Sequence, residues 1–106
     1  MQKDTANIVA QNITRKLLKT YHPQKIILFG SAAKPGDIEV NDLDFFIVKD
    51  DVPRSGIDRI RQLRSLFETD TATDFLIVTT KELQERQTME DPFIMEILNQ
   101  GKVLYG

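Results

Sequence analysis

Cysteine is absent from this 106-residue chain, and histidine occurs only once. The lack of cysteine excludes a disulfide framework, a thiolate zinc site and a cysteine nucleophile. The single histidine excludes a histidine-rich metal centre. Any metal bound by this protein would therefore be a hard cation held by oxygen ligands.

Long apolar runs and a large excess of one charge are also missing. No segment approaches the roughly 20 apolar residues that cross a bilayer, and the stretch that opens with Met1-Gln2-Lys3-Asp4 lacks the apolar segment expected of a signal peptide. The 14 basic and 16 acidic residues give a formal net charge of −2, which argues against a general nucleic-acid coat protein. We expect a cytoplasmic protein that does not bind membranes and whose main partner is not nucleic acid.

What is present is the composition of a globular domain. Hydrophobic residues make up 41% of the chain and charged residues 28%, which is too apolar for a disordered protein. The length matches a single domain of about 100–150 residues. No repeat, low-complexity stretch or long linker divides the chain, so we predict one domain over residues 1–106.

Hydrophobic periodicity and turn residues predict helices and strands around one sheet. Apolar residues at four-residue steps, such as Val9, Ile13 and Leu17, predict a helix over 5–21. Short apolar runs predict strands, and capping residues mark the starts of further helices. The predicted strands are 25–29, 42–49, 73–79 and 103–105, and the predicted later helices are 57–67, one opening at Thr79 and one over 91–101. This mixture predicts an α/β (α+β) class.

The most informative feature is a pair of acidic residues, Asp42 and Asp44, that enter an apolar strand. Alternation along a strand puts both side chains on one face, about 6.6 Å apart along the axis. Two bare carboxylates there would repel each other, and a divalent cation removes this cost. Oxygen-only ligation with few carboxylates suits Mg²⁺, which keeps positions for water and phosphate oxygens.

Two further segments extend this candidate site. Gly30 and Ser31 directly follow a strand, and a short helix opening there would direct N–H groups and a hydroxyl at a phosphate. Asp74 begins another apolar strand. If that strand neighbours the Asp42 strand, Asp74 would be a third metal ligand and could accept the proton of an attacking hydroxyl. The alternative for each aspartate is an ordinary turn or capping residue.

Gly30-Ser31, ten further residues and then Asp42-x-Asp44 resemble the signature of the DNA polymerase beta-type nucleotidyltransferase superfamily. The chain as a whole is similar to minimal nucleotidyltransferase (MNT) domains, which implies a small mixed sheet flanked by helices. The resemblance implies that Gly30 and Ser31 hold phosphates and that Asp42, Asp44 and Asp74 bind two Mg²⁺ ions. Lys34 stands where relatives often have arginine, and it can meet a phosphate as a point charge.

The resemblance also implies a reaction and a partner. An acceptor hydroxyl would attack the α-phosphate of a nucleoside triphosphate, most simply ATP, and release pyrophosphate. MNT-like proteins are typically paired with a HEPN-domain toxin, so the protein would be an antitoxin that adenylylates its toxin. The alternatives are a non-catalytic module that binds the toxin, or nucleotidyl transfer to tRNA or to a small molecule.

Two surface features have open interpretations. Four arginines lie on or just before the predicted 57–67 helix, namely Arg54, Arg59, Arg61 and Arg64. They could contact phosphate or an acceptor, but a solvated helix face is the simpler interpretation. The apolar faces of the first and last helices could exceed what one small sheet covers, and a partner or a homodimer would bury the surplus.

Overall fold

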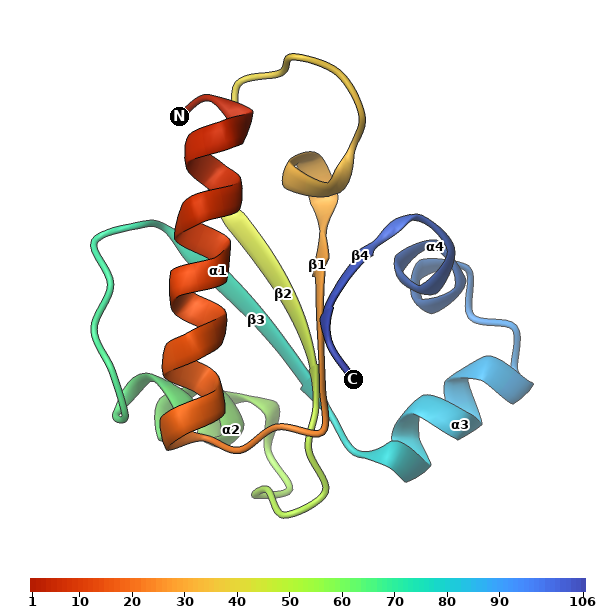
Figure 1. Ribbon diagram of the computed structural model, residues 1–106. Helices are drawn as coiled ribbons and strands as arrows, with labels where there is room; N and C mark the ends of the chain where they lie inside the picture. Colours follow the sequence, from red (N-terminus) through yellow and green to blue (C-terminus); the bar gives the residue numbers. More distant parts are fainter.

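The computed structural model describes residues 1–106 as an α/β domain with a four-stranded mixed sheet (Figure 1). The strands lie in the order β3-β2-β1-β4, with β2 parallel to β3 and β1 antiparallel to both of its neighbours. The elements are α1 (Lys3–Thr20), β1 (Lys25–Phe29), the short 3₁₀ helix η1 (Gly30–Ala33), β2 (Leu43–Val48), α2 (Gly56–Arg64), β3 (Thr73–Val78), α3 (Thr80–Thr88), α4 (Pro92–Gln100) and β4 (Lys102–Tyr105). The predicted α/β class is confirmed.

The helix starts follow the capping chemistry that the sequence indicates. The Thr79 hydroxyl accepts a hydrogen bond from the Glu82 N–H, and the Glu82 carboxylate accepts one from the Thr79 N–H, which completes a capping box for α3. Asp91 accepts hydrogen bonds from two N–H groups at the start of α4, where Pro92 occupies the first turn. Local sequence therefore sets where these helices begin.

Both faces of the sheet are covered, as Figure 1 shows. On one face, Phe45 and Ile47 of β2 belong to a core with Ile13 and Leu17 of α1 and with Leu63 of α2. The opposite face packs against α4 and α3, and its core residues are Ile27, Phe46, Val48, Val78, Ile94 and Ile97. Because side chains alternate along a strand, the continuous apolar run of β2 serves both cores. Asp44 therefore projects on the same face as Phe46, the face that α4 covers.

The interpretation of the four arginines as a solvated face was wrong for Arg59, which is only 7% exposed. Its guanidinium donates hydrogen bonds to the Pro53 and Ile77 carbonyl oxygens and forms an ion pair with Glu82 at 2.7 Å. Arg64 also turns toward the protein: it donates to the Thr73 carbonyl oxygen and lies 5.0 Å from the centre of the Phe75 ring. These two arginines join α2 to β3, and Arg59 also joins α2 to α3.

The predicted 57–67 helix is shorter than expected and ends at Arg64. Leu66, beyond its end, is 41% exposed, whereas Phe67 packs edge-to-face on Phe75. The helical spacing of apolar residues continues to Phe67, beyond the point where the backbone leaves the helix. The hydrophobic periodicity therefore overestimated the length of this helix. No helix in the structure has the length and apolar character needed to cross a membrane.

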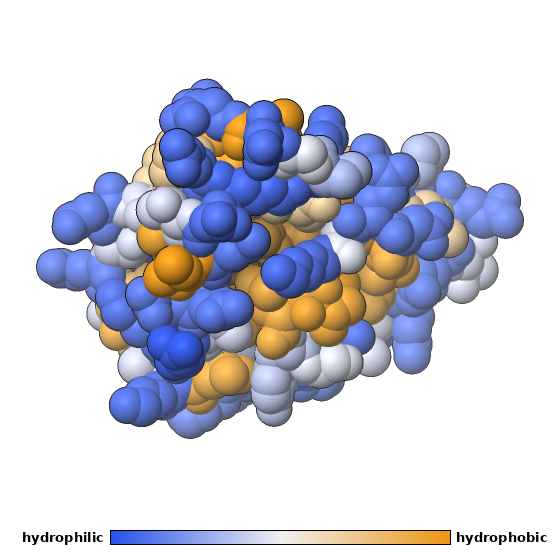
Figure 2. Space-filling view, turned by 45° about the horizontal axis from the view of Figure 1, so that its top comes forward, coloured by the Kyte–Doolittle hydropathy of each residue, from blue (hydrophilic) through white to orange (hydrophobic).

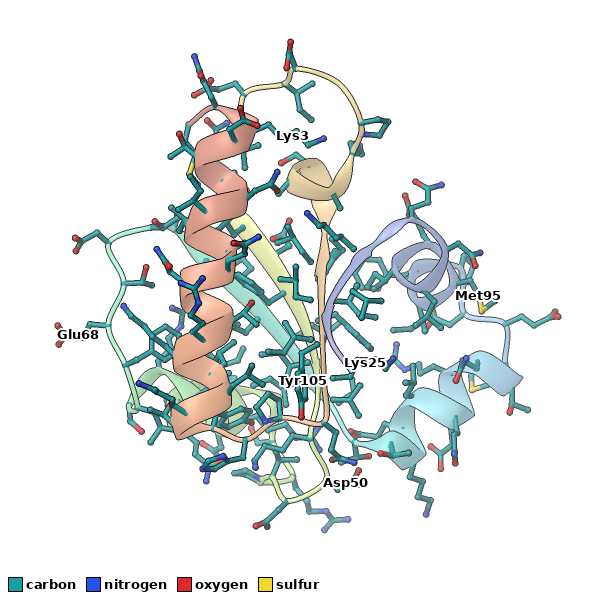
Figure 3. The ribbon with its side chains drawn as sticks, in the orientation of Figure 1. Lys3, Lys25, Asp50, Glu68, Met95 and Tyr105 are labelled. Carbon is teal, nitrogen blue, oxygen red and sulfur yellow. The ribbon has the colours of Figure 1, made fainter.

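Asp50 is an acidic residue outside the Asp42–Asp44 region whose side chain joins segments of the fold. It lies in the loop after β2, at the opposite end of that strand from Asp44 (Figure 3). Its carboxylate accepts hydrogen bonds from the Thr80 N–H at 2.7 Å and from the Gln24 side chain at 2.9 Å. These bonds hold the pKa of Asp50 below its ordinary value, since they favour the charged form.

Candidate functional site

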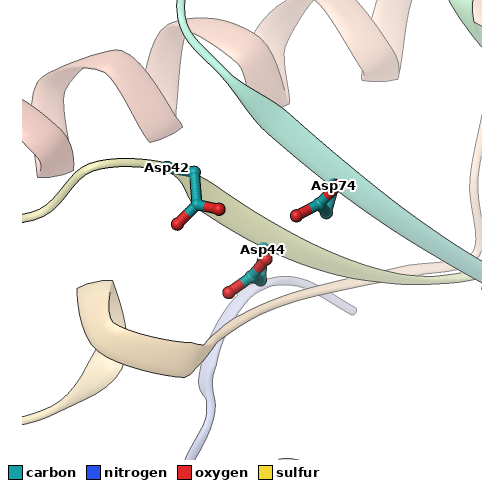
Figure 4. A group of neighbouring side chains, drawn as sticks. All are labelled: Asp42, Asp44 and Asp74. Carbon is teal, nitrogen blue, oxygen red and sulfur yellow. The ribbon is translucent and has the colours of Figure 1, made fainter.

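Three carboxylates meet at the end of the sheet where β2 and β3 begin (Figure 4). Asp42 immediately precedes β2, Asp44 is the second residue of β2 and Asp74 is the second residue of β3. The parallel pairing of the two strands places Asp44 directly opposite Asp74. One oxygen from each residue can be chosen so that all three oxygens lie within 4.8 Å of one another. The structure thus brings together the three acids proposed from the sequence.

The electrostatics of this cluster are unfavourable without a positive charge. The pKa of Asp44 rises from its ordinary 3.8 to about 6, first because the side chain is partly buried. The negative charges of Asp42 and Asp74 raise it further, and so does a hydrogen-bonding contact with Asp74. None of the four salt bridges in the structure involves these three residues. Their mutual repulsion is therefore not balanced by any basic side chain.

This donor set fits a divalent hard cation. The ligand atoms are carboxylate oxygens, the type that Mg²⁺ and Ca²⁺ prefer, and they converge from two adjacent strands. Asp74 is exposed while Asp42 and Asp44 are half-buried, so one side of the cluster is open to water and to a substrate. An open side suits Mg²⁺, which retains waters and binds phosphate oxygens in addition to its protein ligands.

Gly30 stands beside this cluster, at a position where any other residue would be strained. Its φ of +72° is a left-handed conformation that other residues rarely adopt, and an added Cβ would overlap Oδ2 of Asp44. The chain then turns into η1, whose second residue is Ser31. Because a side chain at position 30 would displace Asp44, the glycine allows the phosphate-binding turn predicted from the sequence to lie against the carboxylates.

Ser31 and Lys34 remain available for a ligand. No hydrogen bond in the structure uses the Ser31 hydroxyl, and Lys34, the residue that follows η1, is exposed and makes no salt bridge. The nucleotide-binding roles of Gly30, Ser31 and Lys34 stay predictions, as do the catalytic and metal-binding roles of the three aspartates. The geometry places all six residues at one end of the sheet.

A cavity of about 550 Å³, which the sequence did not indicate, lies between the end of β1 and α4. Phe29, Gly30 and Lys34 line one side, and Phe93, Glu96 and Gln100 of α4 line the other. The three α4 residues recur at helical spacing, so the sequence shows that they share one face of a helix. The sequence does not show that α4 lies against β1, and it is this position that makes the three residues a cavity wall.

The family model "Polymerase beta, Nucleotidyltransferase" matches residues 11–106, and this range contains the three carboxylates and the Gly30-Ser31 turn. Neither the comparison with curated proteins nor the one with solved structures finds a match. The matched range covers most of the chain and all four strands of the sheet. The protein therefore belongs to the polymerase beta nucleotidyltransferase family.

Proposed function

We propose that this nucleotidyltransferase moves AMP from ATP to a hydroxyl group of a partner protein, using Mg²⁺ at the three carboxylates. Family membership supports nucleotidyl transfer in general. The observation that carries the proposal is the convergence of Asp42, Asp44 and Asp74 beside Gly30, because metal ligands and a phosphate-binding turn are then adjacent.

In this mechanism the carboxylates of Asp42 and Asp44 hold the metal, with Asp74 completing the site. Bound Mg²⁺ supplies charge stabilisation for the phosphoryl oxygens. The Ser31 hydroxyl and the backbone N–H groups of η1 bind the terminal phosphates, and Lys34 offsets their charge. These residues position the α-phosphate toward the open side of the cluster.

Asp74 is the proposed general base. It is the most exposed of the three acids and therefore the one an acceptor can approach. The acceptor hydroxyl loses its proton to Asp74, and its oxygen forms a bond to the α-phosphorus. The bond between that phosphorus and the bridging oxygen breaks, and pyrophosphate leaves with the electron pair. The products are the adenylylated acceptor and pyrophosphate.

A protein is the proposed acceptor because the site lies at an exposed end of the sheet, where a large molecule can reach it. Following the resemblance to MNT domains, we propose a HEPN-domain toxin as the partner and neutralisation of that toxin as the outcome. Modification of tRNA or a small molecule, and neutralisation by binding alone, are the alternatives that the experiment separates.

The test uses ATP labelled at the α-phosphate, Mg²⁺ and lysate of host cells. Wild-type protein is compared with the double variant Asp42→Asn/Asp44→Asn. A matched control is Asp37→Asn/Asp51→Asn, which removes the same charge from two exposed residues that make no side-chain hydrogen bond or salt bridge. We expect one labelled protein band with wild type and with the control, and none with the site variant.

Other outcomes have distinct meanings. Label in RNA or in a small molecule would replace the protein acceptor with that class. Absence of any label, from folded protein that still captures and neutralises its partner, would show a binding module instead of an enzyme.

A further inference from the structure

The cavity between β1 and α4 adjoins the carboxylate site. Phe29, on its wall, is paired with Asp44 across β1 and β2. Gly30 lines the cavity, and it lies so close to Asp44 that a Cβ atom at position 30 would overlap the Asp44 carboxylate. A nucleotide held between this turn and the carboxylates would therefore lie beside the cavity.

The ring of Phe93 forms the main apolar wall of the cavity; it contacts another aromatic ring but remains exposed to solvent. The Phe93 ring packs edge-to-face on Phe29, with ring centres 5.9 Å apart and planes at 85°. Phe93 is nevertheless 50% exposed. On the face that Figure 2 presents, patches of apolar surface are exposed among hydrophilic side chains. Contact with Phe29 favours this orientation of the Phe93 ring, and the free surface of the ring can stack against a flat ligand.

Two polar side chains on the same wall have no partner within the protein. Glu96 and Gln100 lie three and seven residues after Phe93, and both are exposed on the cavity side of α4. Neither side chain takes part in any hydrogen bond or salt bridge of the structure. A carboxylate can only accept hydrogen bonds, whereas an amide both donates and accepts. Together they match a flat ring with an amino group and a ring nitrogen acceptor.

We propose that this cavity binds the base of the nucleotide, with Phe93 stacked on the adenine ring and Glu96 accepting a hydrogen bond from the exocyclic amino group. Gln100 supplies the amide that pairs with the ring edge. This inference rests on the proposed function, since the base enters as part of ATP. The volume of about 550 Å³ is within the range of small-molecule sites, and aromatic walls with few polar groups are typical of them.

The test measures equilibrium binding by titration calorimetry, with Mg²⁺ and without an acceptor. The ligands are ATP and ITP, which share the purine ring system but carry an amino group or an oxygen at C6. The variants are Phe93→Ala, Phe93→Tyr and Glu96→Gln. Met89→Ala is the control, because Met89 is a 75% exposed apolar residue that does not line the cavity. Thermal melts confirm that each variant is folded.

We expect Phe93→Ala to weaken ATP binding by roughly tenfold or more, whereas Phe93→Tyr and Met89→Ala stay close to wild type. Wild type should prefer ATP over ITP by about tenfold, the value of one good hydrogen bond. Glu96→Gln should shift this ratio toward ITP, because an amide can donate to the oxygen at C6. The lost charge affects both ligands equally and cancels in the ratio.

Three results would overturn the inference. If wild type binds ATP and ITP alike and Phe93→Ala changes neither affinity, the base lies elsewhere while the proposed function stands. If Phe93→Ala keeps ATP affinity but lowers labelling of the acceptor, the cavity receives the acceptor instead. If wild type binds no ATP in the presence of Mg²⁺, the proposed function fails together with this inference.

Discussion

Replacing Asp44 by asparagine should make the metal-free protein more stable, although it removes a proposed metal ligand. Asp44 is partly buried and faces two other carboxylates, and these surroundings raise its pKa to about 6. Asparagine has nearly the same shape but no charge. The Asp44→Asn variant therefore keeps the packing of β2 against β3 and loses the repulsion.

The size of the effect follows from the pKa. A rise from 3.8 to about 6 is roughly two units, and each unit corresponds to about 1.4 kcal/mol between the two protonation states. Full ionisation would thus cost at most about 3 kcal/mol. Because Asp44 is only half-buried, solvent screening should reduce the gain to about 1–2 kcal/mol. For a domain of this size that is a rise in Tm of roughly 4–8 °C.

The sign of the pH dependence is also determined. The folded pKa lies above the unfolded value, so the carboxyl of Asp44 favours folding most when it is protonated, at low pH. This contribution is lost as the pH rises from about 4 through about 6. The stability difference between the variant and wild type should therefore be small near pH 4 and reach its full size by pH 8.

Thermal unfolding followed by circular dichroism in EDTA, between pH 4 and pH 8, measures this difference. Asp51→Asn, at an exposed loop position, controls for the loss of one negative charge. Added Mg²⁺ should reverse the order, stabilising wild type and leaving Asp44→Asn nearly unchanged. A variant that melts at or below wild type at pH 8 in EDTA would refute the reasoning, and so would a difference independent of pH.

Three further predictions concern single positions. Gly30→Ala should lower both Tm and transferase activity, because its φ of +72° costs about 1–2 kcal/mol for other residues and its Cβ would displace Asp44; unchanged melting would contradict this. Arg59→Met should destabilise the protein by about 2–3 kcal/mol in urea unfolding, because Glu82 and two carbonyl oxygens lose a charged donor. Arg61→Met is the control: Arg61 is exposed, so its replacement should change the stability little. Because the pKa of Asp50 is lowered in the folded protein, its carboxylate contributes stability above its ordinary pKa of 3.8, and this contribution disappears as the pH falls through the folded pKa. Asp50→Asn should therefore lower the Tm at pH 7 but not in acid; an equal decrease in Tm at both pH values would show a different cause.

The candidate site shows how far sequence reasoning reached. Asp42, Asp44 and Asp74 could be selected because each acid enters an apolar strand, and Gly30 and Ser31 because they follow one. Asp74 lies close to Asp42 and Asp44 only because β3 pairs with β2 in parallel, which places Asp44 opposite Asp74. No local pattern specifies which strands become neighbours, since that choice depends on how the whole chain buries its apolar faces.

Arg59 and the cavity show where sequence reasoning failed. An arginine on a helix is assigned to the solvated face by periodicity, yet Arg59 is buried because Glu82 and two carbonyl oxygens, from other segments, satisfy its donors. Phe93 fitted the apolar face of α4, but half of its surface stays exposed over a cavity. In both cases some of the partner groups come from other helices and strands, such as Glu82 of α3 for Arg59 and Phe29 of β1 for Phe93.

The sequence alone determined the helix caps, the apolar strands and the identity of the acidic residues, because propensity, capping and alternation act over a few neighbouring residues. Tertiary structure decided the strand order, the approach of three carboxylates to within 4.8 Å and the cavity beside them. The close contact of Gly30 with Asp44 belongs to the second group, since it joins the end of β1 to the start of β2. These features depend on contacts between residues far apart in the chain, and those contacts exist only once both faces of the sheet are packed.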